Sequence, residues 1–150
     1  MNAPRLFGTI LVPLDDSAIA GTVFSTAVGL ARLNRATLQL LRVVTLDPVF
    51  PPAAHAQPDG LDAKLVREAQ ADLQGWAGGV TGLVLAPPLV MIGDPWREIL
   101  GVARRVGADL IVMGSHRYQG ADRILGTVAA KVVNHAESDV LVVHRRPVRA

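Results

Sequence analysis

Short apolar runs alternate with segments of helical spacing along this 150-residue chain, and the alternation limits it to few folds. Each run has the length of a strand and is apolar almost throughout, which is typical of strands buried on both faces of a sheet. A parallel sheet covered by helices is the architecture that buries such strands. The sequence therefore predicts an α/β fold with strands at Thr9–Pro13, Thr37–Val44, Val84–Val90, Leu110–Met113 and Val140–His144.

Four helices are expected between these strands, where apolar residues recur at steps of three and four. Asp16 or Ser17 is expected to cap the first helix, and Asp94-Pro95 to open the third, which Gly107 ends. Right-handed crossovers place the carboxyl ends of parallel strands at one edge of the sheet. The predicted helices are Ser17–Arg32, Gly60–Trp76, Pro95–Arg105 and Gly126–Ala136, all in a single domain over residues 1–150.

Composition excludes several classes of protein. Hydrophobic residues make up 50% of the chain and charged residues 19%, which excludes a disordered protein and allows a sizeable core. The absence of cysteine excludes disulfide scaffolds and cysteine-ligated zinc or iron–sulfur sites. A net charge of +2 with scattered arginines predicts no nucleic-acid partner. With no signal-peptide pattern and no apolar run long enough for a membrane span, a cytoplasmic protein without a membrane partner is expected.

Two acidic residues, Asp15 and Asp16, directly follow the first predicted strand. Ligands of open parallel sheets bind at the carboxyl ends of the strands, so Asp15 is expected to contact one. Its carboxylate suits ribose hydroxyls or, alternatively, a metal held through water. The other interpretation is that these residues only cap the first helix and complement its dipole. We favour this interpretation for Asp16 and for the adjacent Ser17.

The segment Met113–Val128, between the fourth strand and the last helix, holds most of the remaining chemistry. Gly114 lets the backbone lie close to a ligand, and Gly126-Thr127 opens a helix whose free amides form an anion site. Arg117 or Arg123 offers positive charge to a phosphate. The segment contains neither the lysine-bearing phosphate loop nor the dinucleotide fingerprint, and a turn with a helix cap is the alternative.

Four short motifs in this order and spacing resemble the universal stress protein family, from Thr9 to His144. They are P-x-D at Pro13–Asp15, M-G-S-H at Met113–His116, G-T-V at Gly126–Val128 and D-V-L-V-V at Asp139–Val143. The resemblance implies a Rossmann-like, doubly wound sheet of five parallel strands in the order 3-2-1-4-5. It also implies a protein that is usually a dimer and that belongs to one of two branches, of which one binds ATP.

The ATP-binding branch has the pattern G-x2-G-x9-G-[ST]. Gly114 matches its first glycine and Gly126-Thr127 its final pair, whereas Arg117 replaces the second glycine and the loop is one residue shorter. Some bacterial members share this shortened S-H-R form and look competent to bind nucleotide. The resemblance therefore assigns the chain to the nucleotide-binding branch.

The same resemblance implies which residues hold the nucleotide. Pro13, Leu14 and Asp15, at the end of the first strand, match the family's adenine and ribose contacts. One residue in the second strand packs on adenine, and the other expected contacts belong to the phosphate loop and the last helix. The turn Ile92–Pro95 resembles the one that closes the adenine side. The expected ligand is ATP, alternatively ADP or AMP, with Mg²⁺ or Mn²⁺ at the phosphates. The expected contacts are Pro13, Leu14, Asp15, Val43, Gly114, Ser115, His116, Arg117, Gly126, Thr127 and Val128.

The final strand, Asp139–Val143, is expected at the sheet edge, where its apolar residues invite pairing with a second copy in a two-fold dimer. The leading hypothesis is a stress-response or regulatory module that binds ATP and has no catalytic residues and no metal site of its own. One alternative is a nucleotide-free dimeric interaction protein of the same fold. Another is a slow nucleotide hydrolase or phosphotransferase, including weak autophosphorylation, with His116 and Asp15 as its candidate residues.

Overall fold

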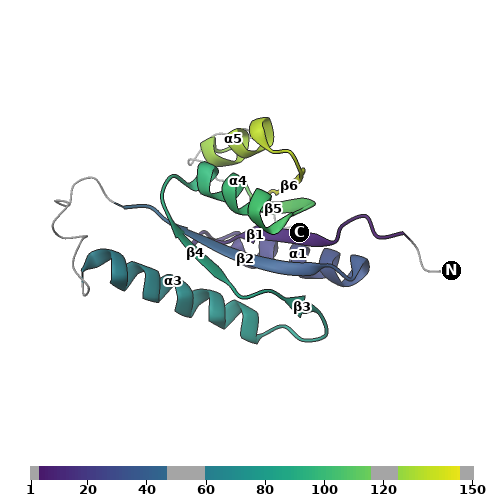
Figure 1. Ribbon diagram of the computed structural model, residues 1–150, viewed down its shortest axis with the longest axis horizontal. Coiled ribbons are helices and arrows are strands. Elements are labelled where there is room, and N and C mark those ends of the chain that lie inside the picture. Colours follow the sequence, from purple (N-terminus) through teal and green to yellow (C-terminus); the bar gives the residue numbers. More distant parts are fainter. Residues whose placement is uncertain (1–3, 47–59, 116–124, 146–150) are drawn as a thin grey trace, which may run out of the picture.

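The computed structural model describes residues 4–46, 60–115 and 125–145. Strands and helices alternate along the chain, and the sheet lies between two layers of helices (Figure 1). The elements are β1 (Thr9–Pro13), α1 (Ala20–Asn34), β2 (Thr37–Val44), α3 (Leu61–Gly78), β3 (Val84–Leu85), β4 (Leu89–Ile92), α4 (Pro95–Val106), β5 (Leu110–Gly114), α5 (Thr127–His135) and β6 (Asp139–Val143).

All strand pairs in the sheet are parallel, as predicted. The strand order is β3-β2-β1-β5-β6, and β4 continues alongside β2. Because β3 and β4 together occupy the place of the third predicted strand, this is the expected order 3-2-1-4-5. The chain runs outward from β1 to β4 and then returns to the other side of β1 with β5, so the topology switches between β1 and β5.

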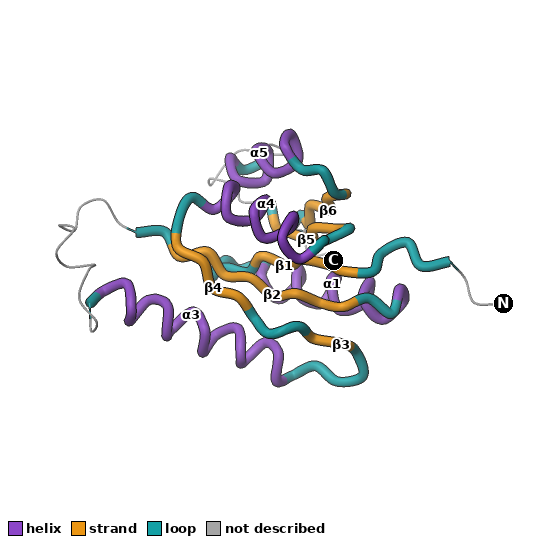
Figure 2. Tube along the Cα trace, in the orientation of Figure 1, coloured by secondary structure: helices purple, strands orange, loops and turns teal. Residues whose placement is uncertain are grey.

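The third strand is not the single run Val84–Val90 that the sequence predicts. It divides into β3 and β4, and Figure 2 shows the loop that separates them. Pro87 and Pro88 have no N–H to donate, so the ladder to β2 is interrupted there. From the pair Leu38–Leu85 to the pair Leu41–Leu89 the third strand uses one more residue than β2, which is the geometry of a bulge.

Gln39 of β2 bridges this bulge. Its side chain is buried at 4% exposure, and Nε2 donates to the Pro87 carbonyl at 2.8 Å and to the Leu40 carbonyl at 3.1 Å. A buried amide is costly unless it is paired, and here the irregular backbone supplies its acceptors. A polar residue inside a buried strand therefore marks the place where its neighbour departs from regular pairing.

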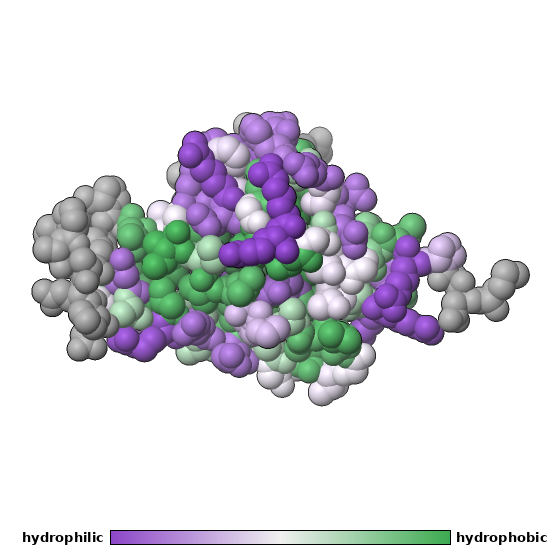
Figure 3. Space-filling view, viewed as in Figure 1, coloured by the Kyte–Doolittle hydropathy of each residue, from purple (hydrophilic) through white to green (hydrophobic). Residues whose placement is uncertain are grey.

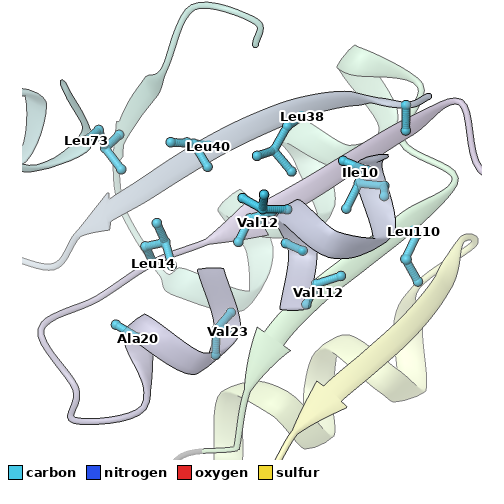
Figure 4. Packing of buried hydrophobic residues seen from close by; sticks show 14 residues of the cluster. Ile10, Val12, Leu14, Ala20, Val23, Leu38, Leu40, Leu73, Leu110 and Val112 are labelled. Atoms are coloured by element: carbon cyan, nitrogen blue, oxygen red, sulfur yellow. The ribbon is translucent and has the colours of Figure 1, made fainter. Parts of the chain in front are cut away.

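Two hydrophobic clusters cover the two faces of the sheet. Successive strand residues point to opposite faces, so Ile10 and Val12 pack with α1 and α3, while Leu11 packs with α4 and α5. Figure 4 shows the first cluster, in which Val12 of β1 lies between Leu40 of β2 and Val23 of α1 in this view. All of these side chains are at most 2% exposed. Double burial of this kind is what the continuous apolar runs predict.

The helix boundaries agree with the sequence at α4 and α5 but not at α1. Asp94 and Gly107 flank α4 as predicted, with Gly107 in the left-handed conformation at φ 65°. The prediction that Asp16 or Ser17 caps the first helix is wrong, because α1 begins three residues later with Ile19 as N-cap and no side-chain cap. The Ser17 carbonyl, not its hydroxyl, receives the Ala20 amide at 3.1 Å.

The two edges of the sheet are formed by β6 and by β3 with β4. Leu141 on β6 is 38% exposed, and Val84 and Ile92 on the opposite edge are 64% and 40% exposed. Figure 3 shows apolar surface along the edge of β3 and β4. The position of the last strand at an edge is as predicted. In the part of the chain that the structure describes, no helix is both long and apolar enough to cross a bilayer.

The bulge gives a test of the fold. Replacing Gln39 with alanine removes the donor to Pro87 and leaves a buried gap, so the free energy of unfolding should fall by about 1–3 kcal/mol. Urea denaturation measures this change. The matched control is Gln70→Ala on the exposed side of α3, which should change stability by less than about 0.5 kcal/mol. Equal denaturation midpoints for wild type and Gln39→Ala would show that the bridge contributes nothing.

Candidate functional site

The candidate site lies at the carboxyl edge of the sheet, at the switch between β1 and β5. Three segments meet this edge: the loop after β1, the end of β5 and the start of α5. Of the residues predicted to bind nucleotide, all but two belong to these segments or to the end of β2. The two exceptions, His116 and Arg117, lie outside the described residues, as does Arg123.

The loop after β1 is held by the backbone of β2 and by its own turn. The Leu14 amide donates to the Leu41 carbonyl at 2.8 Å, which continues the pairing of β1 with β2 beyond Pro13. Asp15 is half-buried, and its Oδ1 accepts the Ser17 amide at 2.9 Å. This is an Asx turn, in which a short carboxylate substitutes for a backbone acceptor. The carboxylate of Asp15 thus lies at the carboxyl edge but does not cap α1.

Arg42 is a residue of this edge that the sequence analysis missed. Its side chain is only 13% exposed, and Nη1 donates to the Leu14 carbonyl at 3.2 Å. Nη2 pairs with Asp16 Oδ1 at 2.5 Å and with Asp72 Oδ2 of α3 at 3.0 Å. The available signal was one charged residue inside the otherwise apolar end of a strand, since such residues are rarely buried without a partner.

Gly114 is required for packing. A Cβ atom there would lie 2.9 Å from Ile19 Cγ2 and 3.3 Å from Val23 Cγ2, so the start of α1 occupies the space of a side chain. The expectation that this glycine lets the backbone approach a ligand stays a prediction, and the structure shows in addition that α1 packs against the end of β5. The consequence is a close approach of the loop after β1 to the end of β5.

Ser115 continues β5 past its last residue by donating its amide to the Val143 carbonyl at 3.0 Å. The residue is 8% exposed, and its Oγ makes no hydrogen bond with any described part of the protein. A buried hydroxyl without a partner is uncommon and calls for a ligand, a water or an ion. The Ser115 hydroxyl therefore needs a hydrogen-bond partner from outside the described part of the protein.

The start of α5 agrees with the prediction. Gly126 is the N-cap, and the first intrahelical bond joins the Ala130 amide to the Gly126 carbonyl at 2.9 Å. The amides of Thr127, Val128 and Ala129 precede this bond and therefore have no acceptor within the helix. The first turn contains no acidic side chain, so its partial positive charge is not neutralised there. These features suit an anion.

Apolar residues border the same edge. Val43 of β2 and Val128 of α5 are both partly buried against the cluster under α4 and α5. The turn before α4 approaches the end of β2, because the Gly93 amide donates to the Val44 carbonyl at 3.1 Å. Gly93 has φ 154°, and a Cβ there would lie 2.7 Å from Glu98 Oε1, so the turn requires a glycine. The predicted adenine side thus has an apolar border and a tight turn beside it.

Hollows adjoin the loop after β1 on its α3 side. One of about 450 Å³ is bordered by Asp15, Ser17 and Trp76, and another of about 240 Å³ by Arg42 and Val43. A third, of about 500 Å³, lies at the opposite edge, near Asp109 and Asp139 at the strand starts. Among the described residues, no group of three or more His, Cys, Asp or Glu side chains is arranged to hold a metal ion.

The chain was compared with known proteins. The model of the universal stress protein family matches residues 6–144. Universal stress protein Sll1388 of Synechocystis is 27% identical over 150 residues, covering 91% of this chain and 97% of the relative. The solved structure of hypothetical protein MJ0577 has a TM-score of 0.80 at 26% identity and covers 95% of this chain and 99% of that one. A universal stress protein solved in complex with cAMP has a TM-score of 0.60 at 26% identity over 93% of this chain and 98% of that chain.

The family match agrees with the architecture. It begins before β1 and ends after β6, so it includes every helix and strand described above. The α/β fold with its parallel sheet is shared with the first of the structural relatives, since the superposition covers nearly all of both chains. The chain therefore belongs to the universal stress protein family.

Proposed function

We propose that this protein binds ATP at the carboxyl edge of its sheet and acts as a regulatory module in a stress response. The observation that carries the proposal is the start of α5, where the amides of Thr127, Val128 and Ala129 lack helical acceptors beside the switch point. An unneutralised helix start at this place favours a phosphate group. The related protein in complex with cAMP, at 26% identity, adds support because its ligand is an adenine nucleotide.

In this proposal the adenosine part lies against the loop after β1. Leu14 and Asp15 would contact the base and the ribose, and Val43 would offer an apolar surface. The Asp15 carboxylate lies on this loop, where its Oδ1 accepts the Ser17 amide at 2.9 Å. ADP or AMP would use the same contacts and lack only the terminal phosphates.

The phosphates would lie between the end of β5 and the start of α5. The Ser115 hydroxyl and the Thr127 hydroxyl are donors there, and His116 and Arg117 belong to the connecting segment. Mg²⁺ or Mn²⁺ would be held mainly by phosphate oxygens and water, as is usual for nucleotide-bound magnesium. The protein would supply orientation and positive potential, and no residue is assigned to catalysis.

A second copy of the chain is the proposed partner. In the part of the chain that the structure describes, β6 pairs only with β5 and so forms an edge of the sheet, and its residues Val140, Leu141 and Val142 are apolar. An edge of this kind pairs readily with another strand, and a two-fold axis would bring β6 of each copy together. The cytoplasm, where nucleotide is available, is the proposed location.

The two alternative functions, a nucleotide-free interaction protein and a slow hydrolase or phosphotransferase, predict different experimental results. A nucleotide-free interaction protein is favoured by Arg117 in place of the second glycine and by the shortened loop. A hydrolase or phosphotransferase would show linear, protein-dependent phosphate release that Asp15→Asn abolishes. The engagement of Asp15 Oδ1 with the Ser17 amide argues against a role for this oxygen as a general base.

Nucleotide binding is tested by isothermal titration of the protein with ATP and Mg²⁺. Gly126→Leu should weaken ATP binding at least tenfold, because the side chain would cover the amides at the start of α5. The fold should persist, since Gly126 has φ −59°, which any residue adopts. Gly101→Leu is the matched control, because a Cβ at Gly101 of α4 meets nothing within 4 Å.

Two outcomes would reject this proposal. Wild-type protein that binds no nucleotide at millimolar ATP with Mg²⁺ would favour the nucleotide-free interaction protein. Equal ATP affinity of wild type and Gly126→Leu would remove the start of α5 from the site.

The dimer is tested by sedimentation at micromolar concentration. Leu141→Lys should convert the dimer to a monomer, because it places a charge on the exposed part of β6. Ile92→Lys is the matched control at the other edge, where the exposed fraction is nearly the same, 40% against 38%. A monomeric wild type, or a dimer that only Ile92→Lys dissociates, would contradict the assignment of the interface to β6.

A further inference from the structure

Arg42 is a charge with a 13% exposed side chain at the end of β2, beside the candidate site. Its guanidinium is mostly removed from water and reaches acceptors on two other segments: the Leu14 carbonyl and Asp16 in the loop after β1, and Asp72 on α3. A planar guanidinium has five donors in a fixed arrangement, so it can hold several acceptors in one geometry. Removal of such a charged group from water would cost free energy if it had no hydrogen-bond partners.

β2 holds both main-chain polar groups of Leu14. The Leu14 amide donates to the Leu41 carbonyl at 2.8 Å, and the Leu14 carbonyl accepts from Arg42 Nη1 at 3.2 Å. Asp15 follows directly, with its carboxylate on the Ser17 amide. A main-chain contact with β2 and the side chain of Arg42 therefore both hold the start of this turn.

Arg42 lies on the opposite face from Val43. Alternation along β2 places Leu38 and Leu40 in the cluster under α1 and α3, and Arg42 follows them at the same period, while Val43 packs in the other cluster. The side chain of Val43 therefore points to the other face of β2 from that of Arg42, although both residues border the hollow of about 240 Å³. The contacts of Arg42 are with the turn that follows β1 and with Asp72 of α3.

Asp72 extends this support to a helix. Asp16 has an 87% exposed side chain and Asp72 a 57% exposed one, so neither ion pair by itself contributes much. Together, however, they place the guanidinium between two carboxylates that would repel each other without it. The loop after β1 is thereby tied to α3, an element that supplies no predicted nucleotide contact.

We propose that Arg42 is a positioning residue for the nucleotide site: it fixes the turn at Leu14–Asp16 through contacts that include Asp72, and it acts without touching the ligand. The inference rests on the proposed function. Because the turn would contact only adenine and ribose, loss of Arg42 should lower the affinities for adenosine and for ATP by the same factor. The affinity gained from the phosphates, measured as the ratio of the two dissociation constants, should not change.

The experiment compares ATP and adenosine binding by isothermal titration in wild type, Arg42→Met, Arg42→Lys and Asp72→Asn. Arg42→Met should weaken both ligands about tenfold, the size of effect expected for a lost charged hydrogen bond. Arg42→Lys should restore part of the loss, since an ammonium group can still reach one acceptor. Asp72→Asn, which leaves the contact with Leu14, should weaken both ligands by a smaller factor.

Arg32→Met is the matched control. Arg32 also ties a helix to a loop, donating from Nη2 to the Thr81 carbonyl at 3.1 Å, but it lies on α1 near the other end of the sheet. It should leave both affinities unchanged. Hydrogen exchange of the Ser17 amide without ligand should be faster in Arg42→Met than in wild type, because the turn loses its second support.

The outcomes separate this inference from the proposed function. If wild type binds neither ligand, the proposed function fails and the inference fails with it. If wild type binds and Arg42→Met binds equally well, only the inference is overturned. A loss for ATP without a loss for adenosine also overturns it, because Arg42 would then act on the phosphates. If Arg42→Met does not fold, the ratio of the adenosine and ATP dissociation constants in Arg42→Lys and Asp72→Asn tests the inference in the same way.

Discussion

Burial of the parallel strands on both faces is the constraint on which the rest of this structure depends. A strand covered on both faces must be apolar almost throughout, and its neighbours must be connected by helices that return over the sheet. Those crossovers bring the carboxyl ends of all strands to one edge. The loop after β1, the end of β5 and the start of α5 therefore meet there whatever side chains they carry.

The edge combines two kinds of polar feature that the core does not tolerate. One is the start of α5, whose first amides have no helical acceptor and no acidic neighbour in the first turn. The other is the partly buried guanidinium of Arg42, which is compensated by Leu14, Asp16 and Asp72. The first can bind an anion from outside the protein, whereas the second is already satisfied internally and gives the turn at Asp15 its position.

Local sequence signals predicted well those features that depend on a few adjacent residues. Asp94-Pro95 and Gly107 bound α4 because proline suits a first helical turn and glycine adopts the left-handed conformation at its end. Local signals failed where distant parts of the chain decide. Asp16 was expected at the start of α1, but Arg42 binds it, and the sequence does not show that Ile19 and Val23 pack against Gly114. Gln39 has a role only because Pro87 lies opposite it in the folded sheet.

By itself, the sequence determined the α/β class, the order of elements and the family, because apolar runs, helical periods and short motifs are properties of neighbouring residues. It also indicated Gly126 as the start of the last helix. Only the tertiary structure decided where the third strand divides, where α1 begins, what occupies the space beside Gly114 and which residue supports the turn at Leu14. Each of these depends on residues that lie far apart in the chain and meet only when the sheet forms, such as Arg42 of β2 and Asp72 of α3.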